Sequence, residues 1–197
     1  QSIHSLLYYW ALHFFFMARV LLNFRVQIHG TLPTNGAVIA CNHQSAIDGI
    51  LILALVPNTV FVFRKSLLIS RFLINSEMIP VGGATNWLNK SKQTPYNKNI
   101  CIFPEGGRYD SAEDIKYRSG VVVIAKNTFR KVYPVAMNTG TIWGRYALLP
   151  KLSAINNTIH ISFLPAMTCN ADLEILERSI KTEVRQIENG DVRFKQI

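Results

Sequence analysis

The fold of this chain depends on the stretch Ala40-Cys41-Asn42-His43-Gln44-Ser45-Ala46-Ile47-Asp48-Gly49. The apolar run at 37–41 leads into it and predicts a buried strand, and the mostly apolar segment 50–56 leads out of it as a helix. Five residues turn an α-helix by about 500°, so His43 and Asp48 would point about 140° apart on a regular helix. Their side chains can meet only if His43 lies in the turn before the helix and Asp48 points back from its first turns. The sequence therefore predicts a strand–turn–helix junction.

A histidine held by a carboxylate is suited to base catalysis. The carboxylate fixes the tautomer of the imidazole and stabilises the imidazolium ion that forms when the ring takes up a proton. The chain contains no Gly-x-Ser-x-Gly sequence, and Ser45 is only two residues from His43. The attacking alcohol is therefore expected to come from a substrate. The alternative interpretation is that the pair is structural, as a histidine near an aspartate usually is.

A second polar cluster favours the catalytic interpretation. Residues 103–108, Phe-Pro-Glu-Gly-Gly-Arg, follow an apolar strand predicted at 99–102. Polar turns that follow two buried strands form the usual geometry of a site in an α/β protein. We expect the two turns to meet in one cleft.

These blocks resemble those of the glycerolipid acyltransferases. Residues 42–48 are similar to the His-(four residues)-Asp block of that family, and residues 103–108 to its Phe-Pro-Glu-Gly-Thr-Arg block. The segment 132–136, Val-Tyr-Pro-Val-Ala, resembles the fourth block, a strand with Val-Pro-Val. Order and spacing resemble the 1-acyl-glycerol-3-phosphate acyltransferases from about residue 25 to 165. The resemblance implies an α/β fold with a mixed, mostly parallel central sheet flanked by helices, plus an N-terminal apolar helix.

The resemblance also implies an activity and a set of site residues. His43 would remove a proton from the free hydroxyl of lysophosphatidate, and Asp48 would hold His43. The oxygen would attack the thioester of acyl-CoA or acyl carrier protein, giving phosphatidate, without a metal ion or cofactor. Backbone N–H groups near the histidine are expected to stabilise the oxyanion. The expected substrate-binding residues are Arg108, Glu105, Gly106, Arg64 and Lys65.

Each expected binding residue has a physical role, and Glu105 and the pair Arg64–Lys65 also have an alternative interpretation. Arg108 can grip a phosphate with two donors, and Gly106 lets the backbone approach a ligand or take a positive φ. Glu105 would hydrogen-bond acceptor hydroxyls or organise the loop around Arg108; alternatively it merely pairs with Arg108. Arg64 and Lys65 match the basic pair of the family's second block; alternatively they are solvated surface charges.

One departure from the family pattern leaves the acceptor open. The chain has Gly82-Gly83 where the family usually has Asp-Arg after Ile-Pro-Val, and that arginine is associated with phosphate binding. Either Arg64, Lys65, Lys90 or Lys92 compensates, or glycerophosphate binding is weakened. The acceptor could then be glycerol-3-phosphate, a lyso-ornithine lipid or another lysolipid. A further alternative is a catalytically weak, membrane-binding homologue.

The N-terminal segment 3–22 is apolar and aromatic, and long enough to span a bilayer, but His4, His13 and Arg19 interrupt it. We divide the chain into a helix at 1–24, which is membrane-associated or covers the core, and an acyltransferase domain at 25–197. A helix in the membrane interface fits best. This predicts a peripheral or monotopic protein on the cytoplasmic face of the membrane. The resemblance also implies that relatives carry extra membrane-embedded sequence upstream of this segment.

Composition and charge agree with such a protein. The 197 residues are 49% hydrophobic, and 21 Lys and Arg against 12 Asp and Glu give a net charge of +9. A basic protein attracts nucleic acid, anionic membranes or acidic substrates. No sequence motif for nucleic acid is present, so the expected partners are a lysophospholipid, the acyl donor and the membrane surface. Cys41, Cys101 and Cys169 are predicted to be buried, reduced thiols.

The remaining elements follow from apolar patterns and turn residues. We predict an exposed loop at 109–118 and a final helix that begins at the cap Asn170 and carries an apolar stripe from Leu173 to Ile187. Further strands are predicted at 24–29, 60–63, 78–81, 131–137 and 158–164, and further helices at 67–73, 87–92 and 120–127.

Overall fold

A computed structural model of the chain describes residues 3–64, 78–81, 86–110, 113–147, 150–151 and 157–190. Within these ranges it contains one seven-stranded sheet in the order β1-β7-β6-β2-β5-β3-β4. Neighbouring strands are parallel except β6 and β7, which are antiparallel. The predicted mixed, mostly parallel sheet is therefore confirmed. The strands are β1 (Arg25–Gly30), β2 (Val38–Cys41), β3 (Thr59–Arg64), β4 (Ile79–Val81), β5 (Asn99–Ile102), β6 (Val132–Met137) and β7 (Thr158–Phe163).

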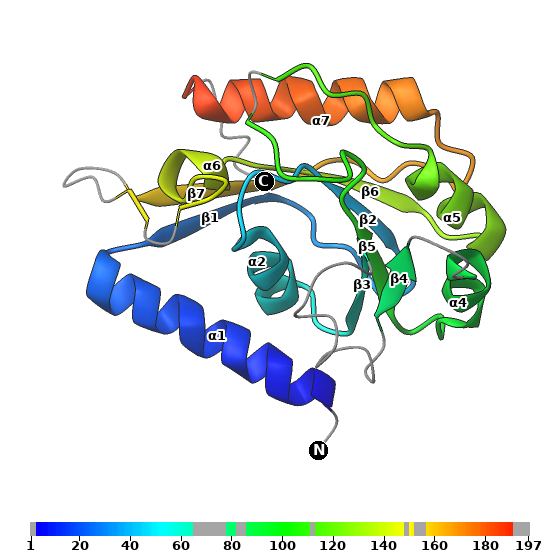
Figure 1. Cartoon of the computed structure of the whole chain (residues 1–197), viewed down its shortest axis with the longest axis horizontal. Coiled ribbons are helices and arrows are strands. Elements are labelled where there is room, and N and C mark those ends of the chain that lie inside the picture. The colour runs from blue at the N-terminus through cyan, green and yellow to red at the C-terminus, as the bar shows by residue number, and fades with distance from the viewer. Residues whose placement is uncertain are drawn as a thin grey trace.

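Helices cover both faces of this sheet, as Figure 1 shows. Helices α1 and α2 lie on one face, and α5 and α7 lie on the other, with α4 beside α5. A short helix, α6, follows β6 directly. The helices are α1 (Ile3–Leu22), α2 (Asp48–Leu55), α4 (Trp87–Gln93), α5 (Gly120–Thr128), α6 (Thr139–Ile142) and α7 (Leu173–Glu188).

Strand β2 lies in the middle of the sheet, and all four of its residues are buried. Ile39 and Cys41 face the core formed with α1 and α2, whereas Val38 and Ala40 face the core formed with α5 and α7. A strand covered on both faces has no solvent side, which explains its continuous apolar sequence. Cys41 and Cys101 are buried free thiols, as predicted, while Cys169 is only half-buried.

Three parallel neighbours place their polar turns at one edge. Strand β2 lies between β5 and β6 and runs parallel to both. The carboxyl ends of these strands therefore meet at the same edge of the sheet, where α/β proteins bind ligands. The turns that follow them are residues 42–48, 103–109 and 138–139. We call the first the histidine turn and the second the glutamate turn.

Two local predictions were wrong. Asp172, not Asn170, caps α7, because its backbone is extended and its carboxylate accepts hydrogen bonds from the N–H groups of Glu174 and Ile175 at 2.8 and 3.0 Å. Tyr117 is buried within the segment predicted to be an exposed loop, because α7 packs over it. The helix predicted at 67–73 and the turn at 82–83 lie outside the described residues.

Candidate active site

His43 and Asp48 meet as their spacing predicts. His43 lies in the turn before α2, and Asp48 is the first residue of α2. Nδ1 of His43 and Oδ2 of Asp48 are 2.8 Å apart. This bond assigns the proton to Nδ1 and leaves Nε2 as the nitrogen that can accept a proton from an alcohol.

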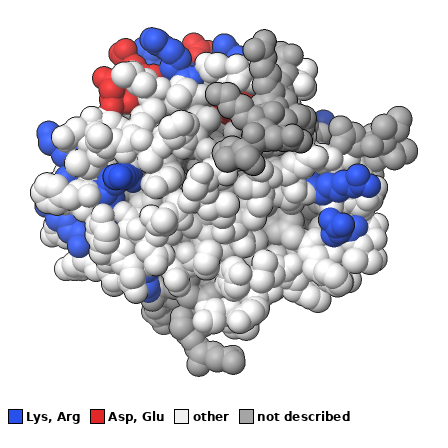
Figure 2. Space-filling view, turned by 180° about the vertical axis from the view of Figure 1, so that it is seen from behind, with Lys and Arg blue, Asp and Glu red and all other residues white. Residues whose placement is uncertain are grey.

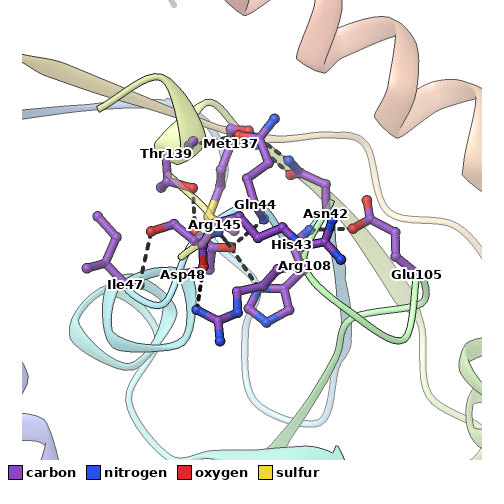
Figure 3. Close-up of polar contacts among 12 residues, drawn as sticks. Asn42, His43, Gln44, Ile47, Asp48, Glu105, Arg108, Met137, Thr139 and Arg145 are labelled. Atoms are coloured by element: carbon purple, nitrogen blue, oxygen red, sulfur yellow. Dashed lines mark hydrogen bonds and ion pairs between the residues drawn. The ribbon is translucent and has the colours of Figure 1, made fainter. Parts of the chain in front are cut away.

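Asp48 is fully buried, and its charge is held by hydrogen-bond donors (Figure 3). Its Oδ2 also accepts from the backbone N–H groups of Gln44 at 2.8 Å and Ser45 at 2.9 Å. Its Oδ1 accepts from the hydroxyl of Thr139. The buried carboxylate thus accepts four hydrogen bonds, two from side chains and two from the backbone.

The glutamate turn holds the histidine from the other side. The ring of Phe103 stacks on the His43 ring, with centroids 4.1 Å apart and planes 21° from parallel. The backbone N–H of Tyr109 donates to the carbonyl of His43 at 2.8 Å. The His43 side chain remains 21% exposed, so its orientation is fixed while its outer edge stays accessible.

Glu105 contacts the main chain of the histidine turn. Its Oε2 accepts a hydrogen bond from the backbone N–H of His43 at 3.0 Å. No ion pair joins Glu105 to Arg108, both of which the structure describes, so the interpretation of Glu105 as a simple partner of Arg108 is wrong. Burial raises the pKa of Glu105 to about 8, and the group is therefore mostly a neutral acid at pH 7.

Glu105 and Arg108 point to different sides of the site. Figure 3 shows the Glu105 carboxyl group directed toward the α7 side of the view, whereas the His43 ring and the Arg108 guanidinium project away from α7. Glu105 lines a recess beneath α7 together with Tyr117 and Lys181. The His43 ring and the Arg108 guanidinium thus project to the same side of the site.

Arg108 is anchored by one of its donors. Its Nη1 donates to the carbonyl of Arg145 at 2.8 Å, and a guanidinium group has further N–H donors for an anion. The Arg145 guanidinium itself stacks on the rings of Tyr109 and Tyr146, 4.8 and 4.9 Å from their centroids. Sequence reasoning assigned no site role to Arg145, which brings a second cation to this turn.

The backbone conformation of the glutamate turn requires a glycine at position 106. Gly106 has φ of +75°, and a Cβ there would lie 2.6 Å from Nε of Arg118. A side chain at Gly106 would therefore be strained and would displace Arg118. Of the other predicted binding residues, Arg64 ends β3, but its side chain and all of Lys65 lie outside the described residues.

The expectation that backbone N–H groups near the histidine stabilise the oxyanion stays a prediction, but three of these groups are already used within the protein. The N–H groups of His43, Gln44 and Ser45 all donate to the carboxylates of Glu105 and Asp48. These three N–H groups support the catalytic pair and are not available for a substrate oxygen.

The segment after β6 also belongs to the site, and sequence reasoning missed its role. Asn42 exchanges two hydrogen bonds of 2.8 Å with the backbone of Met137. The amide oxygen of Gln44 accepts from the N–H of Gly140 at 3.0 Å. The available signal was a run of polar residues, 138–141, directly after a predicted core strand.

A histidine base fixed by a buried carboxylate, beside an arginine at the carboxyl edge of an α/β sheet, defines a site suited to transfer of a group to an alcohol. The family model described as Acyltransferase matches residues 23–138, so the chain belongs to this acyltransferase family. No curated protein matches the chain significantly.

A solved structure has the same fold. It is the 1-acyl-sn-glycerophosphate (LPA) acyltransferase PlsC from Thermotoga maritima, which is similar with a TM-score of 0.70 and 18% sequence identity. The match covers 98% of this chain and 82% of that one. The likeness therefore includes the described sheet and the N-terminal apolar helix.

Proposed function

We propose that the protein transfers an acyl group from acyl-CoA or acyl carrier protein to the free hydroxyl of lysophosphatidate, giving phosphatidate. The observation that carries this proposal is the His43–Asp48 pair at 2.8 Å, with Arg108 projecting to the same side as the His43 ring. The family match supports acyl transfer. The guanidinium supports an acceptor that carries a phosphate.

The proposed reaction needs only groups of the protein and its two substrates. Nε2 of His43 takes the hydroxyl proton while the acceptor oxygen bonds to the thioester carbonyl carbon. The tetrahedral intermediate then expels the thiolate as the carbon–sulfur bond breaks. The imidazolium returns its proton to the sulfur, so the products are phosphatidate and a free thiol. A positioned base of this kind contributes ~10²–10⁴ in rate.

We further propose that α1 lies in the membrane interface at the cytoplasmic face. The segment Ser5–Leu22 is long and apolar enough to cross a membrane, yet only 11% of it is buried within the protein. Its exposed side chains include Leu6, Tyr9, Trp10, Phe16, Val20 and Leu21.

The charge distribution supports the same orientation. In Figure 2 the acidic side chains gather at the top together with Lys and Arg, while the lower half is mostly uncharged with Lys and Arg at its sides. An apolar helix flanked by basic groups suits an anionic bilayer surface. Flotation with phosphatidylglycerol vesicles tests this: Leu6→Ser/Phe16→Ser should release the protein, whereas the exposed-loop control Tyr96→Ser should not. Unchanged flotation of the α1 variant would refute the proposal.

Thiol release with a matrix of donors and acceptors tests the activity. We expect release with lysophosphatidate and a long-chain thioester, and loss of at least ~10²-fold in His43→Ala because its base is removed. His13→Ala, an exposed histidine on α1, is the matched control. Near-wild-type turnover of folded His43→Ala would end the proposal.

A second acceptor class is retained because of Gly82-Gly83, which replace the usual Asp-Arg. Release with glycerol-3-phosphate, a lyso-ornithine lipid or another lysolipid, but not with lysophosphatidate, would favour that alternative. No release with any pair, while vesicles still bind, would favour a catalytically weak membrane-binding homologue.

A further inference from the structure

The two oxygens of Asp48 have unequal sets of donors. Oδ2 accepts from Nδ1 of His43 and from the backbone N–H groups of Gln44 and Ser45. Among the described residues, the only donor to Oδ1 is the hydroxyl of Thr139. The oxygen that does not face the histidine is thus held by a single side chain.

Thr139 is well placed to fix that oxygen. It is fully buried and is the first residue of α6, directly after β6. The residues around it are tied to the histidine turn by the Asn42–Met137 bonds and by the bond from Gly140 N–H to Gln44. The Thr139 hydroxyl therefore sits on a braced segment and does not follow Asp48 if the carboxylate turns.

A carboxylate needs such a constraint, because its terminal torsion is broad and roughly two-fold. Rotation would move Oδ2 away from His43 and disturb the tautomer that leaves Nε2 free. We propose that Thr139 is a positioning residue of the reaction: its hydroxyl holds Oδ1 of Asp48 so that Oδ2 stays on Nδ1 of His43. This inference rests on the proposed acyl transfer through His43.

The role predicts a distinct kinetic signature. Loss of a hydrogen bond to a charged group should lower kcat about 10- to 100-fold, while KM stays within about twofold because Thr139 does not face the ligand. If Oδ2 of Asp48 leaves Nδ1, the imidazolium form of His43 loses its carboxylate partner. The acid limb of the kcat/KM profile should therefore move to lower pH in Thr139→Val.

The other titratable groups near Asp48 do not obscure this readout. Burial raises the pKa of Glu105 to about 8 and raises the pKa of the Cys41 thiol well above its ordinary value. Both groups therefore remain protonated on the acid limb of the profile.

The experiment compares three variants in the thiol-release assay. Thr139→Val removes the hydroxyl and keeps the shape, and Thr139→Ser keeps the hydroxyl. Thr141→Val removes a hydroxyl from the same helix whose bond, among the described residues, goes to the carbonyl of Asn138. We expect the loss and the pH shift in Thr139→Val, recovery to within about threefold in Thr139→Ser, and near-wild-type kinetics in Thr141→Val. Circular dichroism melting checks the fold, and Thr139→Ala replaces Thr139→Val if the latter does not fold.

The outcomes separate this inference from the proposed function. An inactive wild-type protein, tested with the full matrix of substrates, would overturn both. An active wild type with Thr139→Val within threefold would overturn only the role of Thr139. Equal losses in Thr139→Val and Thr139→Ser, or in Thr139→Val and Thr141→Val, would show a merely structural role and overturn it as well.

Discussion

The histidine turn and the glutamate turn both follow buried parallel strands, but they differ in how their polar groups are used. In the histidine turn, Asn42, Gln44, Ser45 and Asp48 are buried, and their described hydrogen bonds include bonds to one another, to the end of β6 and to the segment after it. In the glutamate turn, residues 105–109 are only partly buried. The polar groups of the histidine turn are thus hydrogen-bonded within the protein, whereas the glutamate turn keeps contact with solvent.

This difference indicates that the two turns affect different kinetic constants. Buried polar groups that are fully bonded hold a rigid geometry, which suits the group that moves a proton. Arg108 is half-exposed and has donors left for an anion. Changes in the histidine turn should therefore lower kcat, whereas changes at Arg108 should raise KM.

The strongest test of this division is Asp48→Asn. The amide keeps the shape but carries no charge, so it does not stabilise the imidazolium that forms when His43 takes up a proton. In a serine-protease triad the same change costs ~10⁴ in kcat, and we expect ~10³ or more here. Steady-state thiol release measures it.

Asp110→Asn is the matched control for this substitution. Asp110 lies just beyond the glutamate turn and is exposed, so its variant should retain wild-type kcat. A folded Asp48→Asn protein with kcat within tenfold of wild type would show that the buried pair does not set the chemistry.

Arg108→Ala should have the next largest effect, and this effect should be on KM and not on kcat. Loss of a charged donor pair should raise KM for a phosphorylated acceptor about 10- to 100-fold, with kcat within a few-fold. KM for a non-phosphorylated lysolipid should not change. Arg178→Ala, on the exposed surface of α7, is the control, and an equal KM in both variants would remove Arg108 from phosphate binding.

The sequence was sufficient to predict the parts of this comparison that depend on local spacing. The five-residue separation of His43 and Asp48 is satisfied by one strand–turn–helix junction, and two apolar runs predicted β2 and β5. Thr139 could not be assigned, because its role requires β6 to lie beside β2, and strand order is not written in local patterns.

The environment of Glu105 depends on contacts with residues that are even farther away along the sequence. The recess that buries it is closed by Tyr117 and by Lys181 of α7, and no periodicity in the sequence indicates which turn α7 will cover. From its chemical type, Glu105 was expected to hydrogen-bond acceptor hydroxyls or to organise the loop around Arg108, with pairing to Arg108 as the alternative. Its burial instead gives a neutral acid bonded to the main chain of His43.

This neutral state predicts the smallest effect. Because the pKa of Glu105 is raised to about 8, an amide is a close substitute at pH 7, and Glu105→Gln should retain kcat within about threefold. Glu105→Ala leaves the His43 N–H without its acceptor, which costs about 1–3 kcal/mol for a buried donor. We expect its kcat to fall about tenfold or more in the same assay.

The free energy of unfolding should also depend on pH differently in the wild type and in Glu105→Gln. In the unfolded chain Glu105 ionises near its ordinary value of 4.5, but in the folded protein it keeps its proton up to about pH 8. Unfolding therefore releases a proton between these values, and the free energy of unfolding falls as pH rises through this window. Glu105→Gln removes that contribution, so urea titrations from pH 5 to 8 should show a shallower decline than in wild type. Two outcomes would mean that Glu105 acts as an anion: an equal fall of the unfolding free energy with pH in wild type and Glu105→Gln, or a kcat of Glu105→Gln as low as that of Glu105→Ala. The glutamate turn would then carry the negative charge of Glu105 as well as the positive charge of Arg108.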